Sequence, residues 1–215
     1  MPYGKPVVYL STTPVSKKNE WMFVTYPTVA IVGIKNYKLE NYFDDESFQF
    51  KQKSNITFIA HELGHYYLGT TFVPNSSLRW FFLEGLTDYI SIQAARELLG
   101  TEVYQKILRN YTAEIESLEP TPLSQITVAS EIGETYRYRY TPLLLTAIER
   151  EIGESRMWEW IRVVINSEPQ ITDMQFFKST LLKAGVKQVE YVHILETYID
   201  HPKAKENIVA KVNEG

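Results

Sequence analysis

The chain has 215 residues, of which 44% are hydrophobic and 22% charged, a composition typical of a globular protein rather than a disordered one. Its net charge of -4 and pI near 5.7 give no basic surface for nucleic acid. No apolar run approaches the roughly 20 residues of a membrane span, and residues 1–5 do not begin a signal peptide. We therefore expect a soluble protein that binds neither nucleic acid nor a membrane, with its compartment and oligomeric state left open.

The first 53 residues have the pattern of short strands and turns. Residues 7–10 and 21–34 are rich in β-branched and aromatic side chains, and Pro14 and Pro27 interrupt this region. Residues 41–52 are polar and acidic, which is typical of a loop. We predict a small β-sheet lobe over about residues 1–53.

The remaining chain shows the apolar spacing of helices. Ser54 is a suitable N-cap for a helix over residues 54–68 that Gly69 ends, and Gly100 ends the next helix. The pattern predicts helices over residues 54–68, 78–99, 101–117, 141–152, 154–166, 172–184 and 188–199, followed by a polar tail over 201–215. We therefore predict an α+β fold: a single domain over residues 1–200 with a sheet lobe and a mainly helical lobe that spans 54–200.

The segment His61-Glu62-Leu63-Gly64-His65 lies within the first predicted helix. Residues four apart share a helix face, so both imidazoles can bind one ion, and zinc accepts such nitrogen ligands. Glu62 would take a proton from a water molecule whose pKa the metal lowers to about 7. Two ordinary histidines are the alternative, but the apolar residues around the motif make unpaired imidazoles costly.

A catalytic zinc site needs a third protein ligand. The chain has no cysteine, so that ligand is a histidine or a carboxylate. Metzincins place a glycine and a histidine where this chain has Leu68 and Thr71, which excludes that class. We expect His193 and His201 to be surface or packing residues. Glu84 is the better candidate, because it is a carboxylate inside a run of large apolar residues and needs a cationic partner.

The spacing of these residues is similar to that in known peptidases. A His-Glu-x-x-His helix followed, after the eighteen residues 66–83, by Glu-Gly resembles the aminopeptidase N and leukotriene hydrolase family. Residues 80–89 are also similar to a segment of the glycyl aminopeptidase family. Both families are gluzincins with a thermolysin-like (zincin) catalytic domain. The resemblance implies that residues 1–200 form one such catalytic domain, with the active site in the cleft between its two lobes. The resemblance implies one zinc ion per chain, bound by His61, His65 and Glu84, with Glu62 as the general base.

The same resemblance gives roles to Asp88 and Tyr138. Asp88 matches an aspartate of thermolysin-like enzymes that hydrogen-bonds the first zinc histidine; a plain surface aspartate, or a third ligand in place of Glu84, are the alternatives. Tyr138 matches a catalytic tyrosine that stabilises the oxyanion. Tyr136 and Tyr140 are alternatives for that role, and a surface strand of alternating aromatic and basic residues is the alternative without function.

Gluzincins bind the substrate backbone along an edge strand, which we place at residues 28–36, with Gly33 and Ile34 contacting the substrate. The glutamate that true aminopeptidases use to bind a free amine is absent from this segment, so exopeptidase and endopeptidase activity both remain open. We predict zinc-dependent hydrolysis of a peptide or protein substrate. The alternatives are a catalytically silent, zinc-stabilised binding or scaffold domain, and an accidental motif in a helical interaction protein.

Overall fold

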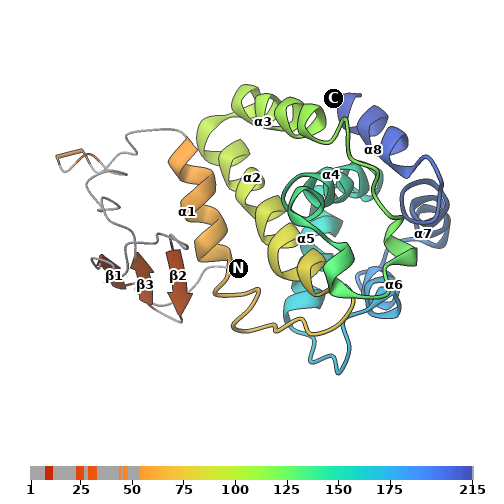
Figure 1. Ribbon diagram of the computed structural model, residues 1–215, viewed down its shortest axis with the longest axis horizontal. Helices are drawn as coiled ribbons and strands as arrows, with labels where there is room; N and C mark the ends of the chain where they lie inside the picture. Colours follow the sequence, from red (N-terminus) through yellow and green to blue (C-terminus); the bar gives the residue numbers. More distant parts are fainter. Residues whose placement is uncertain are drawn as a thin grey trace.

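Figure 1 shows the computed structural model, a molecule built mostly of helices. The structure describes residues 54–214, three short strands within residues 8–32, and residues 44, 46 and 47. About 70% of this described part is helical. Within it, no helix combines the length and the hydropathy needed to cross a membrane.

The longer helices are α1 (Ser54–Gly64), α2 (Leu86–Leu99), α3 (Thr101–Glu114), α4 (Thr141–Ile152), α5 (Glu154–Ile165), α6 (Met174–Lys183), α7 (Gln188–Ile194) and α8 (Ala204–Asn213). Three π-helical turns accompany them: η2 (Phe81–Gly85) before α2, η5 (Tyr136–Tyr140) before α4 and η6 (Leu195–Ile199) after α7. Two 3-10 turns, η3 (Leu123–Gln125) and η4 (Ala129–Glu131), lie between α3 and η5. A helix is present at each of the seven predicted places, although the first ends earlier than predicted.

The predicted α+β fold with an N-terminal β-sheet lobe is wrong, because the described part is about 70% helical and residues 54–214 form no sheet. The strands described are β1 (Val8–Ser11), β2 (Phe23–Tyr26) and β3 (Val29–Val32), paired in the order β1-β3-β2. Each of these strands is four residues long. The β-rich composition of this region therefore overstated the size of the sheet.

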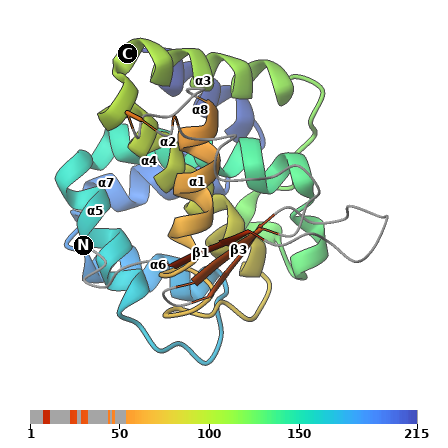
Figure 2. The ribbon, with the colours of Figure 1, turned by 90° about the vertical axis from the view of Figure 1, so that its left-hand side faces the viewer.

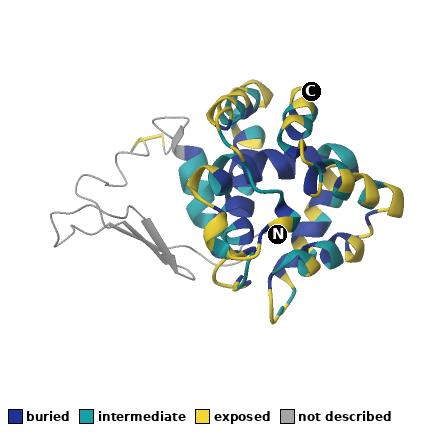
Figure 3. Cartoon of the chain, turned by 45° about the vertical axis from the view of Figure 1, so that its right-hand side comes forward, coloured by how far each residue is buried: buried dark blue, intermediate teal, exposed yellow. Residues whose placement is uncertain are grey.

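The core lies between helices, and α4 is at its centre. Ten of the twelve residues of α4 are buried, which is typical of a helix covered on all sides. Helices α2, α5, α7 and α8 and the turn η5 all contact it. In Figure 3 the buried residues line the inward faces of the helices and the exposed ones lie on the outside. Helix α1 packs along α2 at one side of this body (Figure 2).

The segment predicted as a polar tail contains helix α8 instead. Its residues Ala204, Ile208 and Val212, four apart, are buried, and Ile208 and Val212 belong to the hydrophobic core. Burying a side chain such as Ile208 stabilises a fold by roughly 1.5–3 kcal/mol. The polar composition of the segment belongs to the other faces of α8, and a stripe one residue wide was too narrow to reveal the helix.

Candidate metal centre

Helix α1 ends within the His-Glu-x-x-His motif. Beyond Gly64 the backbone bonds reach three residues back: the amide of His65 donates to the carbonyl of Glu62 at 3.2 Å, and that of Tyr66 to Leu63 at 3.1 Å. The last turn is therefore of the tighter 3-10 type. The rings of His61 and His65 lie 4.9 Å apart between centroids, at 86° to each other.

Each imidazole has a partner at Nδ1, and its Nε2 faces Glu84. Nδ1 of His65 lies 2.9 Å from the carbonyl oxygen of Leu68, and Nδ1 of His61 lies 3.5 Å from Asp88 Oδ1. A carbonyl oxygen only accepts, so His65 carries its proton on Nδ1. The Nε2 atoms of His61 and His65 lie 3.2 and 3.6 Å from the same oxygen, Oε2 of Glu84. Such contacts behind a ligand fix its tautomer and orientation.

Glu84 lies in the π-helical turn η2, where the amide of Leu86 bonds to the carbonyl of Phe81, five residues back. Short π-helical turns occur frequently at functional sites because they redirect side chains at the start of a helix. Phe81 and Phe82 are fully buried and anchor the turn. Glu84 is thus a carboxylate held on a rigid apolar base, with Asp88 one helical turn further on.

A close approach of α1 and α2 presents the motif to Glu84 and Asp88. A Cβ atom added to Gly64 would lie 2.8 Å from Cγ2 of Thr87, closer than real contacts allow. Glycine at this position therefore lets the two helices pack without a side chain between them. Gly64 precedes His65 and Thr87 precedes Asp88, so this contact brings the two histidines close to Asp88.

Ligand atoms of His61, His65 and Glu84 all lie within 4.8 Å of one another. Ligands bound tetrahedrally at about 2.0–2.1 Å from zinc stand roughly 3.3 Å apart, close to the 3.2 and 3.6 Å found here between the imidazoles and Glu84. The side chains are between 12% and 18% exposed, so an ion could reach them while most of its surroundings are protein. Two imidazoles and a carboxylate are a donor set that suits zinc.

Asp88 lies behind His61, as the sequence predicted, and it has a partner that the sequence did not reveal. The hydroxyl of Tyr111 on α3 donates to Asp88 Oδ2 at 2.9 Å, while Oδ1 faces His61. The pKa of Tyr111 is raised, first by burial and then by the charge of Asp88, so its hydroxyl stays protonated. No spacing rule connects α3 to the motif, so this residue could be found only from the fold.

Tyr138 is the tyrosine that reaches the cluster. Its hydroxyl donates to Oε2 of Glu84 at 3.0 Å, and its ring centroid lies 5.9 Å from that of His61. The residue belongs to the second π-helical turn, η5, which crosses η2 closely at Gly85. A Cβ at Gly85 would lie 2.4 Å from Cγ2 of Thr141 and 3.1 Å from the carbonyl oxygen of Arg137. A glycine is therefore needed where the two turns meet.

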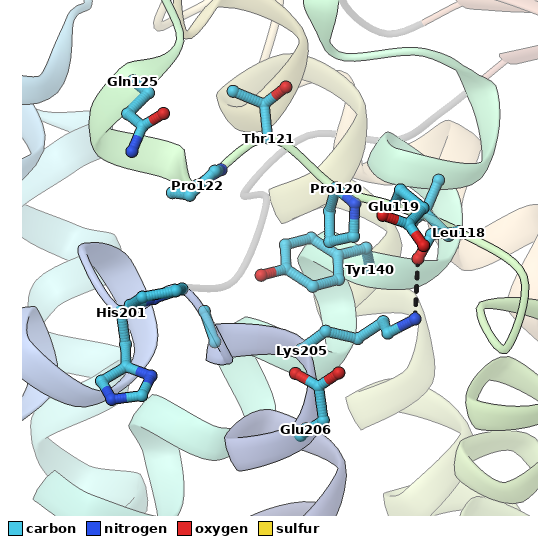
Figure 4. Close-up of a pocket in the computed structure, with 12 residues that line it drawn as sticks. Leu118, Glu119, Pro120, Thr121, Pro122, Gln125, Tyr140, His201, Lys205 and Glu206 are labelled. Carbon is cyan, nitrogen blue, oxygen red and sulfur yellow. Dashed lines mark hydrogen bonds between the residues drawn. The ribbon is translucent and has the colours of Figure 1, made fainter.

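The two alternative tyrosines have other surroundings. Tyr136 donates to the carbonyl of Thr121 at 3.1 Å. Tyr140 lines a separate pocket of about 330 Å³ beside Lys205, whose ammonium donates to the carbonyl of Leu118 at 2.8 Å (Figure 4). The turn is also helical, which rules out the surface strand considered above. Of the three tyrosines, only Tyr138 contacts the candidate ligands.

The pKa values of Glu84 and Glu62 are shifted in opposite directions. Burial alone lowers the pKa of His61, but Asp88 and Glu84 outweigh it and raise the pKa to about 9. Burial alone raises the pKa of Glu84, but hydrogen bonds with the two histidines hold it well below its usual range. For Glu62 burial dominates over the attraction of His61 and His65, so its pKa is raised. Glu84 is thus the ionised ligand, and Glu62 has the pKa shift expected of a proton acceptor.

The other predicted site residues lie elsewhere. His193 is half-exposed and lies 3.5 Å from Glu151, and His201 accepts the amide of Lys203 in the pocket of Figure 4. Both lie in the surface or packing positions expected. Gly33 and Ile34, predicted to bind substrate, lie outside the described residues.

Comparisons with known proteins give no independent assignment for this site. No protein-family model matches the chain, and neither a curated protein nor a solved structure matches it significantly. The function is therefore inferred from the residues and their geometry.

Proposed function

We propose that this protein is a zinc-dependent peptide hydrolase of the gluzincin type. The observation that carries the proposal is the convergence of His61, His65 and Glu84, whose ligand atoms lie within 4.8 Å of one another. Their spacing in the sequence and their distances both suit a tetrahedral zinc site with one open position. A purely structural zinc site would be closed by a fourth protein ligand.

A zinc ion bound by these residues would polarise a carbonyl group and lower the pKa of a water molecule. The proton transfers belong to Glu62. Its carboxylate makes no side-chain hydrogen bond or ion pair with a described residue, and burial raises its pKa. An unpartnered, partly buried carboxylate beside two histidines is costly as a structural feature and suits a group that accepts a proton from water and passes it to the leaving amine.

Two further side chains complete the proposed machinery. The hydroxyl of Tyr138, now donating to Glu84 at 3.0 Å, would donate to the oxyanion of the tetrahedral intermediate. Burial and the charge of Glu84 raise the pKa of Tyr138, so the hydroxyl keeps the proton that this role requires. Asp88 acts as a positioning residue, because it faces Nδ1 of His61 and keeps Nε2 directed at the metal.

The test is zinc content and peptide cleavage in the wild type, Glu62→Gln and a control, Glu102→Gln, which changes an exposed carboxylate on α3. The wild type and both variants should hold one zinc per chain. Cleavage of a mixed peptide library should fall by about 10²–10⁴-fold in Glu62→Gln alone. If zinc-loaded wild type cleaves no peptide that Glu62→Gln leaves intact, hydrolysis is refuted and the catalytically silent, zinc-stabilised scaffold is favoured.

A further inference from the structure

Two arginines lie over the ring of Trp80, and one of them, Arg137, also lies over the ring of Tyr138 in the candidate metal centre. The guanidinium carbon of Arg79 is 4.6 Å from the ring centroid of Trp80, and that of Arg137 is 4.9 Å from it. Arg137 also lies 5.3 Å from the ring centroid of Tyr138. Such cation–π contacts hold a guanidinium group in place without neutralising its charge.

Neither of these arginines has a carboxylate partner among the described residues. The contrast with Arg139, two positions further along η5, is direct: Arg139 lies over Tyr111 and also forms an ion pair with Glu114. Arg137 has aromatic neighbours but no carboxylate within ion-pair distance in the described part of the chain. Its Nε–H is buried and makes no hydrogen bond to the described part of the chain, which is an unfavourable state for a charged donor.

Arg137 is close to the reacting groups as well as unpaired. It precedes Tyr138 in the chain and stacks on the ring whose hydroxyl donates to Glu84 at 3.0 Å. The rest of the centre is acidic, with Glu62, Glu84 and Asp88 around the histidines. A negatively charged substrate group is therefore repelled from most of the site and attracted at the arginine side.

We propose that Arg137, supported by Arg79, is an anion-binding subsite that selects peptides with a carboxylate near the scissile bond. The planar guanidinium fork matches a carboxylate in a bidentate arrangement, which Arg137 would offer through its two terminal nitrogens because its Nε is buried. The carboxylate is either the C-terminal group of the peptide or the side chain of an aspartate or glutamate. This inference rests on the proposed function, since it names the substrate class of the same site.

The experiment uses four peptides of one sequence, with a free or amidated C-terminus and with Glu or Gln beside the scissile bond. KM for cleavage is measured with wild type, Arg137→Gln, Arg137→Lys and Arg109→Gln, the last removing an exposed arginine of α3. We expect the wild type to prefer one carboxylate form by about ten- to a hundredfold. Arg137→Gln should lose this preference and Arg109→Gln should keep it. The form preferred identifies the source of the carboxylate.

Equal KM values for acid and amide peptides in the wild type would overturn the subsite, and so would an equal loss in Arg109→Gln. If Arg137→Gln does not fold, Arg137→Lys decides, because lysine keeps the charge but lacks the bidentate fork. Undiminished discrimination by Arg137→Lys would then contradict the proposal.

Binding of the same peptides to zinc-loaded Glu62→Gln, measured by calorimetry, tests the anion-binding subsite separately from peptide hydrolysis. If no variant cleaves peptide but the acid forms bind more tightly and Arg137→Gln in that background abolishes the difference, the subsite stands and hydrolysis fails. If the wild type cleaves peptides without discriminating acid from amide, hydrolysis stands and the subsite fails.

Discussion

Glu149 on α4 and Glu84 on η2 are both largely buried carboxylates, with 8% and 15% of their side chains exposed. Glu149 ion-pairs with Arg96 at 2.9 Å and accepts hydrogen bonds from Tyr89 at 2.9 Å and Gln93 at 3.2 Å. Arginine keeps its charge at any ordinary pH, so this network is complete within the chain.

The surroundings of Glu84 are different. Its neighbours are Tyr138 and two histidines. Histidine is a good metal ligand, and it is neutral when it binds a metal ion. Two further carboxylates, Glu62 and Asp88, lie beside the same histidines. The comparison teaches that Glu149 has a permanently charged partner within the chain, whereas Glu84 has only histidines and a tyrosine, which is why we propose a metal ion beside Glu84.

The largest expected effect comes from breaking the Glu149 network. Glu149→Gln should lower the free energy of unfolding by about 3 kcal/mol, because it removes the buried carboxylate of Arg96 and leaves the exposed Glu154 as its ion-pair partner. Zinc affinity should not change. Urea denaturation with and without zinc measures both. The control Glu154→Gln removes an exposed partner of Arg96 and should lower the free energy of unfolding by less than about 1 kcal/mol. An equal loss in the two variants would show that the Glu149 network does not stabilise the fold more than a surface ion pair does.

The next effect concerns the contact behind His61. Asp88→Asn should weaken zinc binding by about 10–100-fold, because it removes the charge that orients the imidazole. Tyr111→Phe should weaken it less, since it removes only the hydroxyl that holds Asp88. Competition with a chelating dye gives both dissociation constants. Wild-type affinity in Asp88→Asn would mean that Asp88 has no positioning role.

The smallest effect is expected at Glu151, a carboxylate of α4 that is complete in the same way as Glu149. It accepts the hydroxyl of Tyr198 at 2.6 Å and pairs with Lys211 at 3.0 Å. Burial alone raises its pKa, but these two partners lower it below the ordinary value. The carboxylate therefore stabilises the fold above its unfolded-state pKa, and this contribution disappears as pH falls through the folded-state pKa.

Because Glu151 is partly exposed, solvent screening keeps its contribution below about 1 kcal/mol. Urea denaturation of wild type and Glu151→Gln should differ at pH 7 and converge as the pH falls below the ordinary pKa of glutamate and through the lower folded-state pKa of Glu151. A difference that grows on acidification would have the wrong sign for this ion pair.

The sequence predicted those features that depend on spacing along a helix or on a charged residue within an apolar run. Helical spacing located α2 to α7, and the charge of Glu84 within an apolar run marked it as a residue in need of a partner. The arrangement of His61 and His65 four positions apart predicted that their rings would converge, which they do.

The rest depended on features that no local pattern encodes. The π-helical turns η2 and η5 place Glu84 and Tyr138 in contact, and neither turn has a sequence signature that propensity could detect. Tyr111 and Arg137 matter only because distant segments meet. The sheet lobe was overpredicted because short β-rich runs were extended into a lobe, and α8 was missed because its buried stripe is one residue wide.

The most direct measurement is the free energy of unfolding of wild type and Glu84→Gln as a function of zinc concentration. At a free zinc concentration one hundred times the wild-type Kd, the wild type should gain about 2.7 kcal/mol, with one zinc per chain. Glu84→Gln, if its Kd is about a hundredfold weaker, should gain only about 0.4 kcal/mol. A wild type that zinc does not stabilise, or a Glu84→Gln variant that gains as much, would contradict the metal centre.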